Sequence, residues 1–212
     1  MCSGRVDLEF ILRAFSNGQD GVFIGGCKLD ECNYITHGNY DALANVYLCK
    51  KIMEQIGLNP ERLRIEFMSG ADGILLTEVI NHFTKKVREL GPIGKSEGMD
   101  EKGLKFKLEA VRKLVPYIKL VERERLRVPV KSKEAYHTFF NSDEVNSLFN
   151  ELIGNQLAVS QILSLLREKP LSTGEIADNL GLNPSEVSRY MKHSSRNGFV
   201  RYDVSRKCYA LA

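Results

Sequence analysis

The chain has 212 residues, of which 43% are hydrophobic and 27% charged, and its formal net charge is +3. This composition is typical of a globular protein with a hydrophobic core in one or two domains. No apolar run approaches the roughly 20 residues that cross a bilayer, and residues 1–10 lack the basic start and apolar core of a secretion signal. We therefore expect a cytoplasmic protein without a membrane partner.

Strands and helices are predicted to alternate in the first 90 residues. The β-branched and aromatic run at 22–24 predicts a short buried strand, which the flexible pair Gly25-Gly26 is expected to end, and a second strand is expected at 63–68. Hydrophobic periodicity predicts helices at 7–16, 41–56 and 74–90. This alternation favours an α/β fold with a small parallel sheet.

Residues 93–154 are predicted to form a linker and a helical segment. Residues 93–103 are rich in Gly, Lys and Glu, and a charged helical pattern follows until Pro129 interrupts it. One stripe of this helix is apolar: Leu108, Val111, Leu114, Val115 and Ile118. Such a stripe packs against something apolar, either the chain's own sheet or another subunit.

Residues 155–212 predict a winged helix-turn-helix domain. A helix with an apolar stripe comes first, and Gly181 supplies a turn between two short helices. Each short helix opens with a capping-box pattern, Ser172 with Glu175 and Asn183 with Glu186. Two strand-like stretches at the end of the chain complete the pattern of a wing.

The net positive charge lies in this last domain. It carries eight Lys or Arg against five Asp or Glu, while residues 1–154 hold 22 of each. The second short helix and the wing turn are basic, with Arg189, Lys192, His193, Arg196, Arg206 and Lys207. This pattern occurs in DNA-binding modules, but the excess is small, and winged helices also dock proteins. We expect a docking domain with a solvated basic face and do not expect nucleic acid as a partner.

Five cysteines, an odd number in a chain with no export signal, argue against a disulfide framework. Cys27 and Cys32 lie in the polar turn after the first predicted strand, where a loop can fold both thiolates onto one ion or cluster. Cys2 is a third candidate, because it precedes a glycine turn and a helix start that stabilise a thiolate. The alternative is that these cysteines pack as small hydrophobic residues.

The remaining cysteines and histidines are weaker candidates for ligands. Cys49 is in register with the apolar face of its predicted helix, and Cys208 lies among apolar residues of the predicted wing. We expect both to be core residues. His37 is near Cys32 in sequence, but a loop histidine is more often a solvated polar group than a substitute ligand.

The first 92 residues resemble a known family. The start CSGR, the core GGC-x4-C-x-Y with the following Gly38-Asn39-Tyr40, and the loop from Ser69 to Gly73 are similar to the small iron-sulfur delta subunit of methyl-viologen-reducing hydrogenases. The resemblance implies a 2Fe-2S cluster, with Cys2, Cys27 and Cys32 as the matching ligands.

The resemblance also implies partners and a fold. Members of that family pass electrons from a hydrogenase or formate dehydrogenase to the flavin subunit of heterodisulfide reductase. The expected architecture is a flavodoxin-like α/β domain over 1–92, a helical linker over 93–154 and a winged helix-turn-helix over 155–212. Relatives usually begin with a further strand and cysteine-rich segment, so the resemblance implies that an upstream segment or another chain completes the ligand set.

Electron relay is the function that these features favour. A thiolate-bound cluster exchanges one electron with little rearrangement, and we find no catalytic triad, phosphate loop or paired carboxylates of a substrate site. We therefore expect an electron-transfer subunit of an oxidoreductase complex with no catalytic residue of its own. Two alternatives stay open, namely a redox-responsive DNA-binding regulator and a scaffold that holds zinc on the same thiolates.

Overall fold

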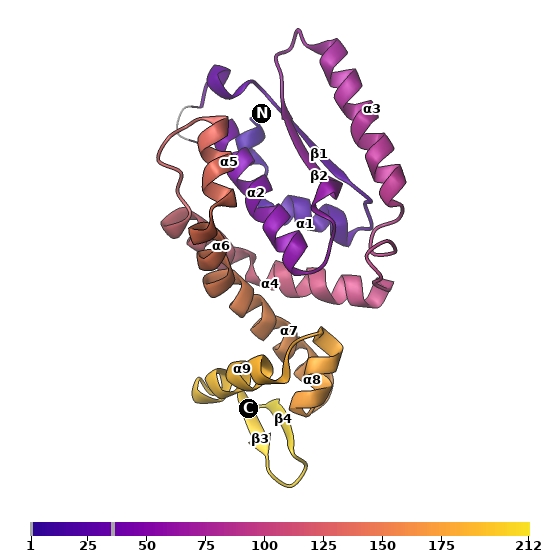
Figure 1. Ribbon diagram of the computed structural model, residues 1–212, viewed down its shortest axis with the longest axis vertical. Helices are drawn as coiled ribbons and strands as arrows, with labels where there is room; N and C mark the ends of the chain where they lie inside the picture. The colour runs from indigo at the N-terminus through magenta and orange to yellow at the C-terminus, as the bar shows by residue number, and fades with distance from the viewer. Residues whose placement is uncertain (1, 35–36) are drawn as a thin grey trace. The chain divides into compact units, whose positions relative to one another are not determined.

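The computed structural model of the protein describes residues 2–34 and 37–212, and the chain divides into two compact units, Met1–Leu148 and Phe149–Ala212 (Figure 1). The first unit is of mixed α/β type, and the second is a winged helix-turn-helix. The first unit continues beyond residue 92 and includes most of the predicted helical segment. The predicted α/β class and the order of its parts are confirmed.

A parallel pair of strands forms the centre of the first unit. β1 (Val22–Gly26) pairs with β2 (Leu63–Phe67), so that Val22 lies opposite Leu63 and Gly26 opposite Phe67. The connection between them is α2 (Asn39–Gln55), as a parallel pair requires a crossover. Within the described residues the sheet has these two strands.

The expectation that Gly25 and Gly26 end the first strand is wrong, because both belong to β1. Their partners are Glu66 and Phe67 of β2. A Cβ atom at position 26 would lie 2.8 Å from Ser3 Oγ and 3.0 Å from the Phe67 ring. Glycine at this position therefore permits close packing rather than a turn.

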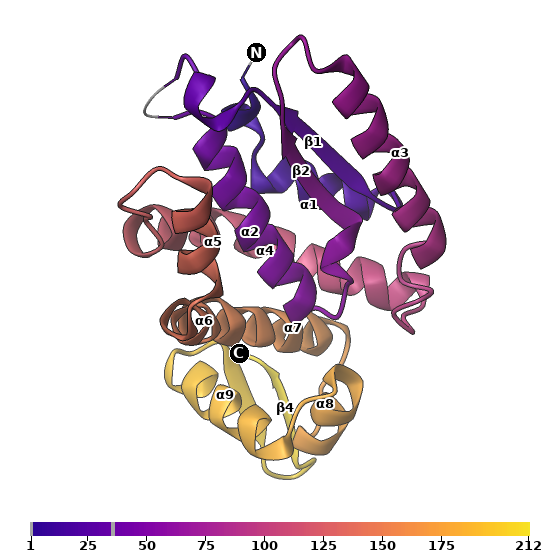
Figure 2. The same ribbon diagram turned by 45° about the horizontal axis from the view of Figure 1, so that its top comes forward.

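Helices cover both faces of the strand pair. α1 (Leu8–Ser16) begins at the N-cap Asp7 and contacts α2, whose buried side includes Leu48, Cys49 and Ile52. α3 (Gly73–Leu90) lies on the other side of the sheet from α2 (Figures 1 and 2), where its Phe83 ring centroid is 5.8 Å from that of Phe23. The sheet is thus enclosed between two helical layers.

The middle helices also belong to the first unit. α4 (Glu101–Arg125) packs on α1, and Leu108, Val111, Val115 and Ile118 of its predicted stripe are buried. α5 (Lys133–Asn141) packs on α2, with the Tyr136 and Tyr40 ring centroids 5.2 Å apart, and α6 (Asp143–Phe149) follows. The apolar stripe is therefore covered by this chain itself.

Arg62 anchors the predicted linker to the start of β2. Arg62 is the last residue of η3, a short 3-10 helix at Pro60–Arg62, and its side chain is fully buried. The guanidinium donates to both carboxylate oxygens of Glu97, at 2.6 and 3.1 Å. It also donates to Ser96 Oγ and to the carbonyl oxygens of Asp20, Leu90, Gly91 and Pro92. Residues 90–97 are thereby held against the sheet.

The second unit has the predicted order of elements. After η4 (Asn150–Gly154, π-helical) come α7 (Asn155–Glu168), α8 (Thr173–Leu180), α9 (Pro184–Arg196) and the antiparallel strands β3 (Val200–Asp203) and β4 (Cys208–Leu211). Both predicted capping boxes form, and Gly181 ends α8 in the left-handed conformation. The core contains Ile162, Leu166, Leu171, Ile176, Ala177, Val187, Met191 and Val200.

In the described part of the chain, no helix combines the length and the apolar character that a bilayer span requires.

Candidate functional site

Three cysteines gather at the carboxyl end of the strand pair. Cys27 directly follows β1, and Cys32 comes at the end of η2, a 3-10 turn at Leu29–Glu31. Cys2 is the N-cap of η1 (Ser3–Arg5), which contacts both β1 and α2. Two segments that are distant in the sequence therefore bring three thiols to one edge of the sheet, the usual place for a ligand in an open α/β fold.

The closest pair of sulfurs has the spacing of two metal ligands. Cys2 Sγ lies 3.8 Å from Cys32 Sγ. Two thiolates that bind one tetrahedral ion at about 2.3 Å lie roughly 3.8 Å apart. Across residues 2–34 and 37–212, no three His, Cys, Asp or Glu side chains are placed to hold a single ion. The arrangement thus offers a pair of ligands with a third thiol beside it.

Glycines allow the segments around the thiols to approach one another. A Cβ atom at Gly4 would lie 2.4 Å from the Gly38 carbonyl oxygen, and one at Gly38 would lie 2.6 Å from Cys32 Sγ. Real Cβ atoms do not approach backbone or sulfur so closely. Together with Gly26, which packs against Ser3, these glycines bring the backbones around the thiols into contact.

Backbone N–H groups favour the charged form of one thiol in particular. The amides of Asn39 and Tyr34 hydrogen-bond to Cys32 and lower its pKa. Burial and then the neighbouring Cys32 thiol raise the pKa of Cys27. Cys2 Sγ accepts a hydrogen bond from the Gly4 amide at 3.4 Å. The loop around Cys32 is therefore a preformed environment for a thiolate.

Asn39 is a site residue that its position in the sequence did not single out as functional. Its buried side chain donates from Nδ2 to the carbonyl oxygens of Cys27 at 2.9 Å and Lys28 at 2.7 Å. The same nitrogen lies 3.6 Å from Cys27 Sγ. Asn39 thus joins the start of α2 to the loop that carries Cys27. A polar residue in the first turn of a helix, just after a cysteine loop, is the signal that could have found it.

Two further contacts hold the cysteine loop in place. Tyr40 donates from its hydroxyl to Asp30 Oδ1 at 3.3 Å, and Lys28 Nζ lies 3.6 Å from Asp72 Oδ2 in the loop before α3. The Ser69 amide and hydroxyl lower the Asp72 pKa by hydrogen bonding to that carboxylate. The loops that follow β1 and β2 are therefore connected.

An unpaired hydroxyl beside the thiols is consistent with a bound group. Ser3 Oγ is buried, and no hydrogen-bond partner for it is present in the described structure. Ser3 follows Cys2 in the sequence, and its hydroxyl packs against the Gly26 backbone. A buried hydroxyl usually has a partner, and hydrogen bonds to cluster sulfurs are a common way of tuning an iron-sulfur centre. The donor set and its surroundings fit such a group.

The other predicted assignments agree with the structure. Cys49 is fully buried in α2, where burial raises its pKa to about 12, and Cys208 is buried in β4. His37 is exposed, with Nδ1 3.2 Å from Asp41 Oδ2. Neither Cys49 nor His37 therefore has the environment of a thiolate or imidazole ligand at this site.

The chain resembles hydrogenase and reductase proteins over less than half of its length. Residues 1–91 match the family described as methyl-viologen-reducing hydrogenase, delta subunit. Over 91 residues, 43% of this chain, it is 47% identical to an iron-sulfur subunit of the F420-non-reducing hydrogenase of Archaeoglobus profundus. It is also 43% identical over 91 residues to the vhu iron-sulfur subunit of the same kind of hydrogenase in Methanococcus maripaludis. These stretches cover 66% and 67% of the two relatives.

A third relative matches a stretch of similar length within a much longer protein. This relative, a component of the ferredoxin:CoB-CoM heterodisulfide reductase of Methanosarcina mazei, is 47% identical over 94 residues, which are 44% of this chain and 12% of that protein. The chain thus spans about an eighth of that relative. In the second unit, residues 158–202 match the family described as bacterial regulatory protein, arsR family.

A thiol-bearing α/β unit followed by a winged helix-turn-helix is the class of protein that the fold and the site define. The match with the Methanococcus maripaludis relative covers 67% of that protein at 43% identity, and it identifies the family of this chain. The chain belongs to the methyl-viologen-reducing hydrogenase delta subunit family.

Proposed function

We propose that this chain is a cytoplasmic electron-transfer subunit that holds a 2Fe-2S cluster on Cys2, Cys27 and Cys32. The observation that carries the proposal is the convergence of these thiols from two distant segments, with the Cys2 and Cys32 sulfurs at the spacing of two ligands of one tetrahedral ion. When bound, such a cluster accepts and releases one electron at a time.

The residues around the thiols supply what a cluster of this type needs. The amides of Asn39 and Tyr34 stabilise charge on Cys32, and the Gly4 amide points at Cys2. The Asn39 side chain keeps the Cys27 loop in position. Because 2Fe-2S clusters usually take four ligands in two pairs, the proposal requires a fourth ligand besides these three thiols. Cys49 is unsuitable, since it is fully buried away from this site in α2.

The relatives support a place between a hydrogenase and heterodisulfide reductase. The same stretch of sequence is found in one protein named for a hydrogenase and within another named for heterodisulfide reductase. An electron relay that contacts both enzymes accounts for that distribution. We propose a hydrogenase or a formate dehydrogenase as the electron donor and the flavin subunit of heterodisulfide reductase as the acceptor.

Anaerobic purification of the full chain with its native partners tests the cluster. We expect iron and acid-labile sulfide in equal amounts and a paramagnetic signal after reduction with dithionite. Cys27→Ser is expected to abolish that signal, because one thiolate is lost. The matched control is Cys208→Ser, which changes a buried cysteine of the other unit and is expected to leave the iron content unchanged.

Metal analysis also separates the alternatives. Anaerobic material that holds no metal contradicts the proposal, and material that holds zinc in place of iron supports the zinc scaffold. Copurification of hydrogenase or heterodisulfide reductase subunits with the wild-type chain supports the proposed partners. If these subunits are absent from purified material that retains iron, the proposed partners are contradicted but the proposed cluster is not.

A redox-responsive DNA-binding regulator is the second candidate, and the surface of α9 favours it. Arg189, Lys192 and Arg196 are exposed along this helix, and within the described chain none of them forms an ion pair. Glu186 at the start of α9 is engaged in the capping box. The outward face of the helix thus carries uncompensated positive charge, as in helices that enter the major groove.

The salt dependence of binding tests this second function. The full chain is titrated with a short mixed-sequence DNA duplex at several salt concentrations, and DNA binding predicts an affinity that falls steeply with salt. Lys192→Gln is expected to reduce the slope of log affinity against log salt by about one. Lys169→Gln, at the end of α7, is the matched control outside α9. Affinity that is absent or insensitive to salt contradicts DNA binding.

A further inference from the structure

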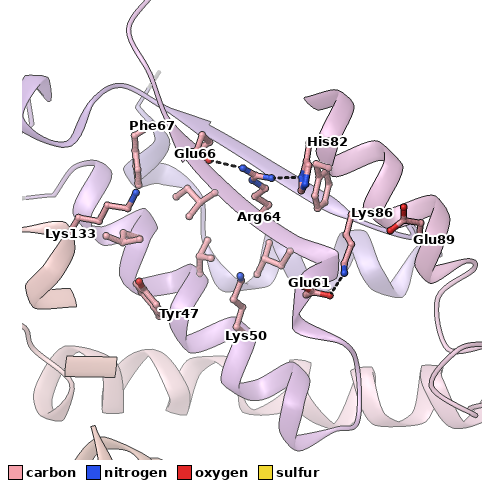
Figure 3. A pocket seen from close by; sticks show the side chains of 15 residues that line it. Tyr47, Lys50, Glu61, Arg64, Glu66, Phe67, His82, Lys86, Glu89 and Lys133 are labelled. Atoms are coloured by element: carbon pink, nitrogen blue, oxygen red, sulfur yellow. Dashed lines mark hydrogen bonds and ion pairs between the residues drawn. The ribbon is translucent and has the colours of Figure 1, made fainter. Parts of the chain in front are cut away.

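A groove runs along the free edge of β2. A cavity of about 510 Å³ is lined by all five residues of this strand and by side chains of α2 and α3 (Figure 3). On the α2 side it is lined by Leu43, Val46, Tyr47 and Lys50, and on the α3 side by His82, Phe83, Lys86 and Glu89. The groove lies within the first unit and extends the plane of the sheet.

The strand edge inside the groove presents unpaired backbone groups. Successive residues of a strand direct their N–H and C=O groups to opposite sides. The Met68 amide donates to the Gly26 carbonyl of β1, so residues 64 and 66 also face β1, while Ile65 and Phe67 face the groove. In the described structure, no strand pairs with β2 on this side. The amide and carbonyl of Ile65 are therefore free to bind another strand.

The two helices cover more sheet than the chain supplies. Lining residues come from α2 on one wall, from α3 on the opposite wall and from β2 at the back, and no further strand of the described chain lies along this edge. Parallel sheets are normally covered on both faces, and exposed edges of this kind are templates for strand addition. A strand added at this edge would lie between α2 and α3.

The two walls differ in polarity. Leu63, Ile65 and Phe67 share the face of β2 that meets α2, because Arg64, between them, reaches His82 of α3 at 3.0 Å. The α2 wall is thus mainly apolar. Apart from Phe83, the groups on the α3 side are polar, and their charges are partly neutralised by ion pairs of Arg64 with Glu66 at 3.1 Å and of Lys86 with Glu61 at 2.8 Å.

Two lysines on the apolar side form no close ion pair with the described residues, and Glu61, whose charge acts on Lys50, is bound to Lys86 at 2.8 Å. Neither Lys50 nor Lys133 forms an ion pair with any described residue. Figure 3 shows Lys133 beside Phe67 at one end of the strand and Lys50 near Glu61 at the other. An occupant that pairs with both would carry an acidic side chain at each end of an apolar stretch.

We propose that the β2 groove binds an extended segment of a partner protein as a third strand. The segment has apolar side chains toward α2, polar side chains toward α3 and an acidic residue near each end. Main-chain hydrogen bonds to Ile65 and Phe67 supply affinity, and the alternating side chains supply selectivity. This surface lies on the side edge of the sheet, so the proposal does not depend on the cluster.

A synthetic peptide and hydrogen exchange test the docking mode. The probe is Asp-Thr-Ile-Thr-Val-Thr-Asp. In an extended strand its Asp, Ile and Val side chains share the face toward α2, and its Thr side chains share the face toward α3. The matched control peptide has Lys in place of Asp at both ends. We expect the acidic peptide to bind the full chain saturably and the basic peptide to bind at least about fivefold more weakly. Bound peptide is expected to protect the Ile65 and Phe67 amides and to leave the exchange of the Arg64 amide unchanged, since that amide already faces β1.

Two methylated peptides distinguish strand addition from ordinary pocket binding. One carries N-methyl groups on the Thr residues and the other on Ile and Val, so each blocks a different side of the added strand. We expect one of them to lose at least about tenfold in affinity and the other to bind nearly normally. Equal affinities of the two methylated peptides for the chain overturn the proposal.

Substitutions in the protein complete the test. Lys50→Glu and Lys133→Glu are each expected to weaken the acidic peptide by about fivefold, while Lys102→Glu on the exposed side of α4 has no effect. The proposal is overturned if the acidic peptide does not bind. It is overturned as well if the Ile65 amide becomes protected with rising protein concentration alone, because a second copy of the chain would then be the occupant.

Discussion

The two ends of the β1–β2 sheet differ in how completely their polar groups are paired. At the amino end of β2, Arg62 is fully buried and donates to a carboxylate, a hydroxyl and four carbonyl oxygens. At the carboxyl end, three thiols lie together with an unpaired Ser3 hydroxyl. The first end is a closed network, and the second retains unused ligands and an unused hydrogen-bonding group.

This difference separates a structural cluster of polar residues from a binding site. A buried charge whose donors are all used has no capacity for a further ligand, so it contributes to stability. Groups that the fold brings together and leaves unpaired have that capacity. We therefore expect substitutions near Arg62 to change the free energy of unfolding, and substitutions near the thiols to change metal content first.

Arg62→Met is expected to have the largest effect on stability. It leaves the Glu97 carboxylate, whose side chain is 7% exposed, without its cation. Breaking a buried ion pair from one side costs about 3–5 kcal/mol. Urea denaturation of the purified protein measures the loss. Lys86→Met, which breaks the exposed pair with Glu61, is the control and is expected to change the free energy of unfolding far less.

The pair can also be replaced as a whole. Arg62→Met combined with Glu97→Leu removes both charges and is expected to recover part of the lost stability. Equal stability of Arg62→Met and the wild type would show that the guanidinium does not hold residues 90–97 to the sheet.

Gly38→Ala is expected to have a smaller effect on stability and a large effect on bound iron. The added Cβ atom would lie 2.3 Å from the Tyr34 carbonyl oxygen and 2.6 Å from Cys32 Sγ. Relief of that contact costs about 1–3 kcal/mol and moves a proposed ligand. Iron analysis and urea denaturation on the same preparation separate the two consequences.

Gly73→Ala is the matched control for this change. It lies at the start of α3, and no atom lies within 4 Å of the added Cβ. Alanine favours the helix by up to about 1 kcal/mol there, so we expect unchanged iron content and equal or higher stability. Full iron retention in Gly38→Ala would contradict the role of this close approach.

The helices and strands of residues 1–92, the elements of the last domain and both capping boxes could be predicted, apart from exact ends, because they depend on local periodicity and on neighbouring residues. Arg62 could not, since an arginine before a strand has the same local pattern whether it is exposed or buried. Asn39 and Gly38 gain their roles from contacts with loops that pack against α2 after folding. Cys27 and Cys32 could be singled out because they share one turn. The proximity of Cys2 to Cys32 depends on tertiary packing. The resemblance implied it, but local sequence patterns could not predict it.

Acid is expected to weaken the closed network by less than Arg62→Met does. Burial acts to raise the Glu97 pKa, but the hydrogen bonds and charge of Arg62 hold it below the ordinary value of 4.5. A lowered pKa in the folded state adds stability above about pH 4.5, and this contribution is lost as the pH falls further. Protonated Glu97 still forms hydrogen bonds, so the loss is partial.

The difference between two stability curves isolates this effect. Unfolding free energies of the wild type and Glu97→Gln are measured from pH 7 down to acid pH. We expect the gap between them to narrow below pH 4.5, because the substituted residue cannot lose a charge. A gap that stays constant with pH would show that Glu97 does not titrate as a partner of Arg62.

Cys49→Ala is expected to have the smallest effect. The thiol is fully buried in α2 and its pKa is raised to about 12 by burial, so it behaves as an apolar group. Loss of one buried sulfur atom costs about 1 kcal/mol, with no change in iron content. In metal-free folded protein, we expect iodoacetamide to modify the exposed Cys27 and to spare Cys49, which mass spectrometry measures. Loss of iron in Cys49→Ala would instead place a ligand in the core and remove the distinction between the site and the surrounding fold.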